Sequence, residues 1–221
     1  MKITTHFALS LTVMLLVSTP ALPAADRDGS VEPTELRCEY LTDPLGIDVT
    51  KPRLSWQLQA TDAGSRGERQ TAYQVLVAST KALLDQGRGD LWNSGTIVSD
   101  QSVHVVYDGA PLTSGTACFW KVRVKDEKGI LSPWSAPARW TMGLLSKNDW
   151  SAKWIGADKT FERKQGWPPP DNDVPDPWLR KTFTLDAKPG RALVYVASVG
   201  YHELYVNGRK IGDTVLAPSV V

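Results

Sequence analysis

Three side chains near the end of the sequence have the types and spacing of a sugar contact. Tyr201, Glu203 and Tyr205 alternate with other residues, so they share one face if residues 201–206 form a strand. Aromatic rings stack on the apolar faces of sugars, and a carboxylate accepts hydrogen bonds from hydroxyl groups. Aromatic pairs also stabilise sheets by cross-strand packing, which is their commoner use. Carbohydrate binding and packing within a sheet therefore both remain open.

A proline-rich loop precedes these residues, in the stretch FERKQGWPPPDNDVPDPW at 161–178. Its two tryptophans, Trp167 and Trp178, form a second candidate pair for stacking on a sugar. Its carboxylates could offer oxygen ligands to Ca²⁺; they are Asp171, Asp173 and Asp176. Calcium needs about six or more oxygens, and the spacing of an EF-hand loop is missing. We therefore expect a solvated acidic loop and no cofactor, with calcium as the alternative.

The histidines give no indication of catalysis. Outside the N-terminal stretch the sequence has His104 and His202, both within alternating apolar patterns. We expect His104 to be a surface or hydrogen-bonded strand residue, and His202 to be partly buried at a strand start. No Gly-x-Ser-x-Gly motif, phosphate loop or dinucleotide fingerprint accompanies them. No residue is therefore assigned a catalytic role.

Two cysteines, Cys38 and Cys118, lie at inward positions of predicted strands. Their spacing matches no metal-binding motif, since the sequence has neither CxxC nor HExxH. An oxidising compartment would permit a disulfide if the two Cα atoms lie within about 7 Å. The sequence leaves a disulfide and two buried thiols as alternatives.

Short strand patterns and turn signals recur from residue 35 to residue 143. Seven segments are rich in Val, Tyr and Trp and mostly alternate: ELRCEYL, RLSWQL, TAYQVLVAS, LWNSGTI, SVHVVYDG, CFWKVRVKD and ARWTMG. In CFWKVRVKD, apolar residues from Cys118 to Val124 occupy one face, as in a half-buried antiparallel strand. Residues 31–145 are therefore predicted to form a fibronectin type III or immunoglobulin-like β-sandwich. Residues 80–87 are expected to form a short helix between Thr80 and Gly87.

A second β-rich region is predicted at residues 150–221. Strand patterns occur at LRKTFTL, ALVYVAS, YHELYV and KIGDTVL, and Asn207-Gly208 is typical of a type I′ hairpin turn. This is about half the number of strands that a closed jelly roll requires. The sequence thus predicts an all-β chain, with a sandwich followed by an incomplete jelly-roll-like domain.

The N-terminus and the charge balance indicate the compartment and exclude one class of partner. Lys2, an apolar run from Phe7 to Ser18 and small residues around Ala24 are typical of a signal peptide over residues 1–25. We therefore expect export to the periplasm or the medium, with no membrane anchor after cleavage. The net charge of +1 argues against a nucleic-acid surface, which needs clustered Lys and Arg.

The order of several phrases carries a family resemblance over nearly the whole mature chain. The phrases are LRCEYLTDPLGIDVTKPRLSWQL, TAYQVLVAS, FWKVRVKDEKG, WSAPARWTMGLL, DWSAKWIGA, LRKTF and GYHELYVNGRKIGD. Together they resemble the N-terminal part of bacterial α-L-rhamnosidases of glycoside hydrolase family 78.

The resemblance implies a multidomain enzyme that removes terminal L-rhamnose with inversion. In such enzymes the two catalytic carboxyl groups belong to an (α/α)₆ barrel further along the chain. No residue of this sequence matches the barrel motifs, so the 221 residues are expected to be a non-catalytic fragment, inactive alone. A stand-alone carbohydrate-binding or interaction module is the alternative. The expected partners are a rhamnose-containing glycan or the remainder of a split rhamnosidase.

Overall fold

The computed structural model describes residues 29–156 and 178–213. The chain divides into two compact units, Met1–Ala152 and Lys153–Val221. The predicted signal peptide, Trp167 and the three loop aspartates Asp171, Asp173 and Asp176 all lie outside the described residues. The proposals made for them remain predictions.

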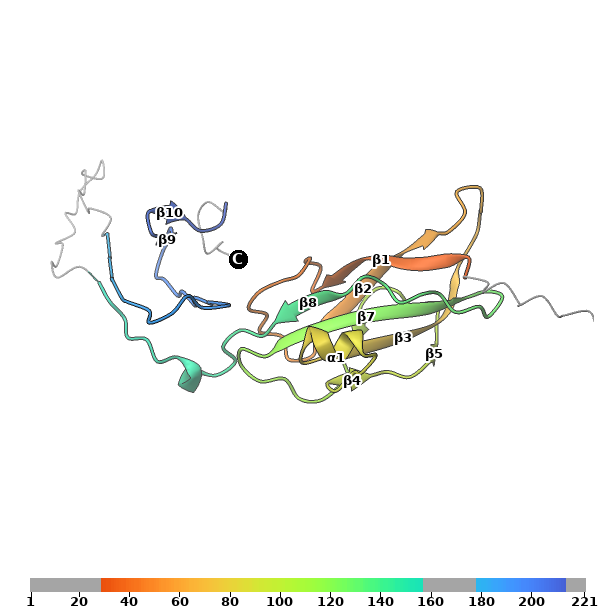
Figure 1. Cartoon of the computed structure of the whole chain (residues 1–221), viewed down its shortest axis with the longest axis horizontal. Helices are drawn as coiled ribbons and strands as arrows, with labels where there is room; N and C mark the ends of the chain where they lie inside the picture. Colours follow the sequence, from red (N-terminus) through yellow and green to blue (C-terminus); the bar gives the residue numbers. More distant parts are fainter. Residues whose placement is uncertain (1–28, 157–177, 214–221) are drawn as a thin grey trace, which may run out of the picture. The chain divides into compact units, whose positions relative to one another are not determined.

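The described part of the first unit has eight strands, one or two in each of the seven predicted segments: LWNSGTI forms two short strands, and the first strand begins at Val31, before ELRCEYL. They are β1 (Val31–Cys38), β2 (Arg53–Ala60), β3 (Gln70–Ala78), β4 (Trp92–Asn93), β5 (Ile97–Val98), β6 (Val105–Val106), β7 (Ala117–Asp126) and β8 (Ala138–Thr141). One antiparallel sheet has the order β1-β2-β6, and the other has the order β4-β3-β7-β8 with β5 also paired to β3. The first unit is therefore the predicted two-sheet sandwich (Figure 1).

Alternation along the long strands creates the core of the sandwich. On β7 every second side chain is buried, and Cys118, Trp120, Val122 and Val124 are all fully buried as predicted. Trp56 from the first sheet and Trp140 from β8 join the same apolar cluster. Burial of these large side chains supplies most of the driving force for folding, at roughly 25 cal/mol per Å² of apolar surface.

The predicted short helix is α1 (Lys81–Asp85). The Thr80 hydroxyl accepts the Leu83 backbone N–H at 3.2 Å, and Gly87 adopts φ +74°, which ends the helix. Leu84 is fully buried and joins a small second apolar cluster with Leu76. Both predicted helix boundaries are thus confirmed.

Two buried polar side chains fasten loops to the sandwich. Gln70 accepts the Trp56 indole N–H at 2.9 Å and donates to the backbone carbonyls of Ser99 and Gln101. Asp126 accepts backbone N–H groups from Ser30, Lys128 and Ile130 at 2.8–3.1 Å. Because Gln70 and Asp126 each have hydrogen-bond partners, their burial does not carry the cost of an unpaired polar group.

The two cysteines of the first unit are free thiols. Cys38 and Cys118 are both buried, and burial raises the pKa of each, that of Cys118 to about 12. The thiolate form is therefore not populated at neutral pH, and both residues act as small apolar core groups.

In the second unit the described regular structure is one hairpin, β9 (Tyr205–Val206) and β10 (Arg209–Lys210). Asn207 and Gly208 have φ values of +50° and +76°, as a type I′ turn requires. A 3₁₀ turn at Lys147–Asp149 precedes this unit and is capped by Ser146. The positive φ values of Asn207 and Gly208 confirm the predicted hairpin turn.

The other strands predicted for the second unit are not formed in its described residues. Residues 179–185 and 192–198 are irregular, and Phe183 and Val194 are 75% and 63% exposed. A strand pattern acquires strand structure when its backbone groups pair with a neighbour and its apolar face is covered. No such neighbour lies within residues 178–213, so the prediction of these two strands is wrong for this structure. Across the described residues, no helix has the length and apolarity to cross a membrane.

Candidate functional site

A polar network lies at the β1–β2 turn and begins with an ion pair. The carboxylate of Glu39 accepts the Arg53 Nη2–H at 2.6 Å and the Arg53 backbone N–H at 2.5 Å. The guanidinium hydrogen bond holds the pKa of Glu39 below its usual value. Glu39 is therefore an ionised anchor, and it is unsuited to act as a proton donor near neutral pH.

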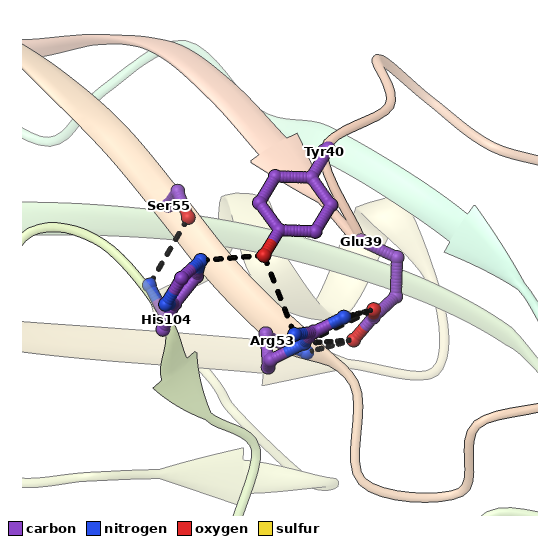
Figure 2. A network of polar contacts seen from close by, with 5 residues as sticks. All are labelled: Glu39, Tyr40, Arg53, Ser55 and His104. Carbon is purple, nitrogen blue, oxygen red and sulfur yellow. Dashed lines mark hydrogen bonds and ion pairs between the residues drawn. The ribbon is translucent and has the colours of Figure 1, made fainter.

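Tyr40 continues the network to His104 (Figure 2). Arg53 donates to the Tyr40 hydroxyl at 3.3 Å, and this hydroxyl lies 2.7 Å from His104 Nε2. The backbone N–H of His104 donates to Ser55 Oγ at 3.2 Å. The guanidinium also lies 5.0 Å from the centre of the Tyr40 ring, in cation–π geometry. The imidazole is thus fixed both through its ring and through its backbone.

Three members of the network have left-handed backbone conformations. Glu39, Tyr40 and His104 have φ values of +48°, +66° and +59°. Such conformations cost of order 1–3 kcal/mol each and persist where surrounding contacts determine them. His104 lies just before β6, and its side chain is exposed and hydrogen-bonded, in agreement with the prediction of a surface or satisfied residue. Sequence patterns gave no indication that Glu39, Tyr40 and Arg53 would gather around it.

His104 also lines an open cleft of about 390 Å³ between the edges of the two sheets. One wall comes from β6 and its flanks, through His104, Val106 and Asp108. The opposite wall comes from the second sheet, through Tyr73 on β3 and Trp92 on β4. We call this hollow the edge cleft.

Two residues that line the edge cleft, Tyr73 and Asp108, have shifted pKa values. Burial raises the pKa of the Tyr73 hydroxyl, so it remains a hydrogen-bond donor at neutral pH. The Lys51 ammonium donates to Asp108 Oδ1 at 2.9 Å and lowers the pKa of that carboxyl. Asp108 is therefore an ionised acceptor at the rim.

The predicted sugar-contacting residues are partly brought together in the second unit. The Tyr205 hydroxyl donates to Glu203 Oε2 at 2.8 Å, and Lys210 pairs with the other carboxylate oxygen. The hydrogen bond from Lys210 is the main cause of the lowered pKa of Glu203. Tyr201 and Tyr205 are 59% and 50% exposed. Only Tyr205 of the three lies in a strand, and a backbone hydrogen bond from the Ile211 N–H to the Leu204 carbonyl at 2.8 Å extends the hairpin beyond the β9–β10 pair.

Two other predicted residues of this unit are also placed. His202 is half-buried as predicted, and its Nδ1 lies 2.8 Å from the Ser198 hydroxyl oxygen. Trp178 is 94% exposed, and its proposed partner Trp167 lies outside the described residues. Over residues 29–156 and 178–213, no cluster of three or more His, Cys, Asp or Glu side chains could hold a metal ion.

Two family profiles match the chain in order. The first is described as the Rha78A-like, N-terminal immunoglobulin domain and matches residues 33–146. The second is described as the alpha-L-rhamnosidase N-terminal domain and matches residues 187–221. The first match covers the β-sandwich, and the second includes the hairpin.

Relatives of known sequence and structure agree with these matches. An alpha-L-rhamnosidase of Streptomyces avermitilis is 39% identical over 190 residues, which cover 80% of this chain and 18% of the relative. The crystal structure of a Streptomyces avermitilis alpha-L-rhamnosidase complexed with L-rhamnose matches at 48% identity and a TM-score of 0.53, over 57% of this chain and 12% of that one. An alpha-L-rhamnosidase structure from Dictyoglumus thermophilum matches at 38% identity and a TM-score of 0.54, over 58% of this chain and 14% of that one.

The chain thus spans about a fifth of the length of the curated relatives that it matches. The matched part is the N-terminal region in both family profiles, and the β-sandwich of the first unit is the domain that the first profile represents. From its fold and its sequence together, the chain belongs to the α-L-rhamnosidase family of glycoside hydrolase family 78 and corresponds to the N-terminal region of those proteins.

Proposed function

We propose that these 221 residues serve as the non-catalytic N-terminal region of an exported α-L-rhamnosidase. The parent reaction would be the inverting hydrolysis of terminal α-L-rhamnosyl residues in glycosides. The observation that carries this proposal is the ordered match of two N-terminal family profiles to one chain. The role of the residues would be to fold as a β-sandwich and to associate with the remainder of a rhamnosidase.

The protonation states of the described carboxylates support a non-catalytic role. Inverting glycosidases need one carboxylic acid with a raised pKa and one carboxylate, about 6.5–9.5 Å apart. In the candidate sites Glu39, Asp108 and Glu203 each accept a hydrogen bond from a cationic side chain, and each has a lowered pKa. Such groups are anchors and acceptors, and none of the three suits the role of general acid.

Incubation of the purified 221-residue protein with an aryl α-L-rhamnoside tests this proposal. We expect no release of the aryl group above the rate in buffer. A release rate that rises in proportion to protein concentration and survives repurification would contradict the proposal. A variant that replaces three candidate carboxylates (E39Q, D108N and E203Q together) controls for contaminating enzyme, because a contaminant would keep its rate in that preparation.

A second candidate function is carbohydrate binding at the hairpin. The exposed rings of Tyr201 and Tyr205 flank Glu203, which already accepts hydrogen bonds from Tyr205 and Lys210. A rhamnose-containing glycan would stack on the rings and donate a hydroxyl to the carboxylate. Titration of the protein with L-rhamnose, followed through the amides of residues 198–213, tests this function. The absence of any shift at these amides would refute it.

A further inference from the structure

The edge cleft of the first unit is a second candidate binding site, besides the hairpin, because aromatic and polar residues line it. The cleft lies beside β6, the short edge strand of the first sheet, and residues from both sheets line it. Neither family profile assigns a ligand to this domain. Binding in this cleft would not depend on the proposed accessory role, because all of its lining residues belong to the sandwich.

The size and the walls of the cleft fit one small ring. Its volume of about 390 Å³ is at the low end of the range for small-molecule sites, about 300–1,000 Å³. Trp92 and Tyr73 supply aromatic surface, and Val106 adds an apolar rim. Trp92 is held by Tyr107, whose ring packs edge-on against it at 5.5 Å. The aromatic wall is therefore in place before any ligand arrives.

The polar groups of the cleft offer complementary hydrogen bonds. Tyr73 presents a hydroxyl that has no hydrogen-bond partner among the described residues, although only 8% of this residue is exposed. Asp108 presents a carboxylate whose Oδ1 accepts from Lys51. Gln101 also lines the cleft, and its amide N–H groups are already bonded to the carbonyls of Val103 and His104, which leaves its carbonyl oxygen as an acceptor. The lining residues thus carry one donor and two acceptors beside aromatic side chains.

The polar network holds His104, which belongs to the wall of the cleft formed by β6 and its flanks. His104 is held by Tyr40 through its ring and by Ser55 through its backbone (Figure 2). Tyr40 is in turn held by Arg53, which is anchored by Glu39. A strained residue that is held from two directions is typical of a site whose geometry is set in advance.

The charge of the lining selects the class of ligand. The lining residues include one carboxylate, which is paired with Lys51, and no Lys or Arg, so the lining offers no cationic group to an anionic ligand. One carboxylate and one imidazole are too few ligands for a protein-held metal ion. We infer that the edge cleft binds a single ring of a neutral sugar, with the ring against Trp92 and its hydroxyls bonded to Tyr73 and Asp108.

Titration of the isotope-labelled 221-residue protein with L-rhamnose tests this inference. We expect saturable shifts of the Trp92 indole N–H and of the amides of His104 and Val106, with a Kd in the range of about 1 mM or weaker. Sorbitol offers hydroxyl groups without a ring, and we expect it to bind more weakly. No shift at these positions up to about 100 mM, or equal binding of sorbitol, would overturn the inference.

Four variants separate this site from the hairpin. Tyr73→Phe removes one hydroxyl with no bond in the described structure, and Asp108→Asn removes one exposed charge; each is expected to weaken binding about 3- to 10-fold. Asp100→Asn, a nearby carboxylate outside the lining, is the matched control and should leave Kd unchanged, whereas Tyr205→Phe tests the hairpin, where the second candidate function places sugar binding. If Tyr205→Phe abolishes binding while Tyr73→Phe has no effect, the sugar binds at the hairpin and the inference is wrong.

Discussion

The two units of the chain carry similar strand patterns, yet they differ in how far those patterns become structure. In the first unit CFWKVRVKD lies within the ten-residue strand β7, which is paired on both sides by β3 and β8. In the second unit ALVYVAS remains irregular within the described residues, and Val194 is 63% exposed. Both segments alternate and both are rich in Val and aromatic residues. The difference lies in their neighbours.

This contrast shows that an alternating pattern is a necessary condition for a strand and that pairing completes it. β7 contacts a neighbour along its whole length, so its backbone N–H and C=O groups are satisfied and its apolar face is covered. The described residues of the second unit offer only the β9–β10 pair, which has two residues on each side. An isolated hairpin of this kind is marginally stable in water.

The largest expected effect comes from removing a core side chain of the first unit. Trp120 is fully buried, so Trp120→Ala should lower the free energy of unfolding by about 3–5 kcal/mol. Trp178→Ala in the second unit removes the same side chain from a 94% exposed position and should change that free energy by less than about 0.5 kcal/mol. Urea unfolding followed by far-UV circular dichroism measures both. Similar losses for the two variants would break the comparison.

The next effect comes from Asp126. Burial raises its pKa, but the hydrogen bonds from Ser30, Ile130 and Lys128 outweigh burial, and the pKa in the folded protein is lowered. A lowered folded pKa gives stability that is present above the unfolded value of about 3.9 and is lost as the pH falls through the folded pKa. Asp126→Asn should cost about 1–3 kcal/mol at neutral pH and should flatten the decline of stability below about pH 4.

Unfolding midpoints from about pH 2 to about pH 7 in roughly one-unit steps test this prediction. Glu203→Gln is the matched control, because Glu203 lies in the exposed hairpin region of the second unit. That variant should leave the unfolding of the first unit unchanged at every pH. An unchanged acid limb in Asp126→Asn would show that other carboxylates determine the acid sensitivity.

A smaller effect is expected for Tyr107, whose buried hydroxyl donates to the Ala110 carbonyl at 2.7 Å. Tyr107→Phe should cost about 1 kcal/mol, since it removes one hydrogen bond and leaves the ring in place. Tyr205→Phe removes a comparable bond to Glu203 at an exposed position and should have no effect on the first unit. Thermal unfolding of the two variants and the parent protein makes the comparison. A larger effect for Tyr205→Phe would be inconsistent with the independence of the sandwich.

The smallest effect on global stability is expected at the hairpin turn. Gly208 has φ +76°, so Gly208→Ala strains the turn and should remove the nuclear Overhauser contacts between β9 and β10. The unfolding midpoint of the first unit should not move, because the substitution lies in the other unit. A shift of that midpoint would show that the two units unfold together.

The sequence predicts the first unit well because local and non-local signals agree there. Alternation placed β7 and the other long strands, Thr80 and Gly87 marked the ends of α1, and Asn207-Gly208 marked the turn. The polar network could not be predicted, since Glu39 and Arg53 are 14 residues apart and His104 is 64 residues from Tyr40. Such contacts depend on the pairing of β1, β2 and β6 and on left-handed backbone angles that no composition rule indicates.

The edge cleft escaped prediction for a related reason. Its lining comes from four separate strands and their flanks, and no two of its key residues, Tyr73, Trp92 and Asp108, are close in sequence. In the second unit the sequence predicted the hairpin and its turn, and within the described residues the paired strands cover Tyr205–Val206 and Arg209–Lys210, because period-two alternation from Tyr201 to Tyr205 does not by itself supply a partner strand.

Native-state hydrogen exchange of the whole 221-residue protein tests the contrast between the two units most directly. We predict that the amides of β3 and β7 exchange only through global unfolding, as expected for core strands. Amides of residues 179–199 should exchange at close to the rates of an unstructured chain. Protection of residues 179–199 equal to that of β7 would contradict the account, since it would require pairing that the described structure does not contain.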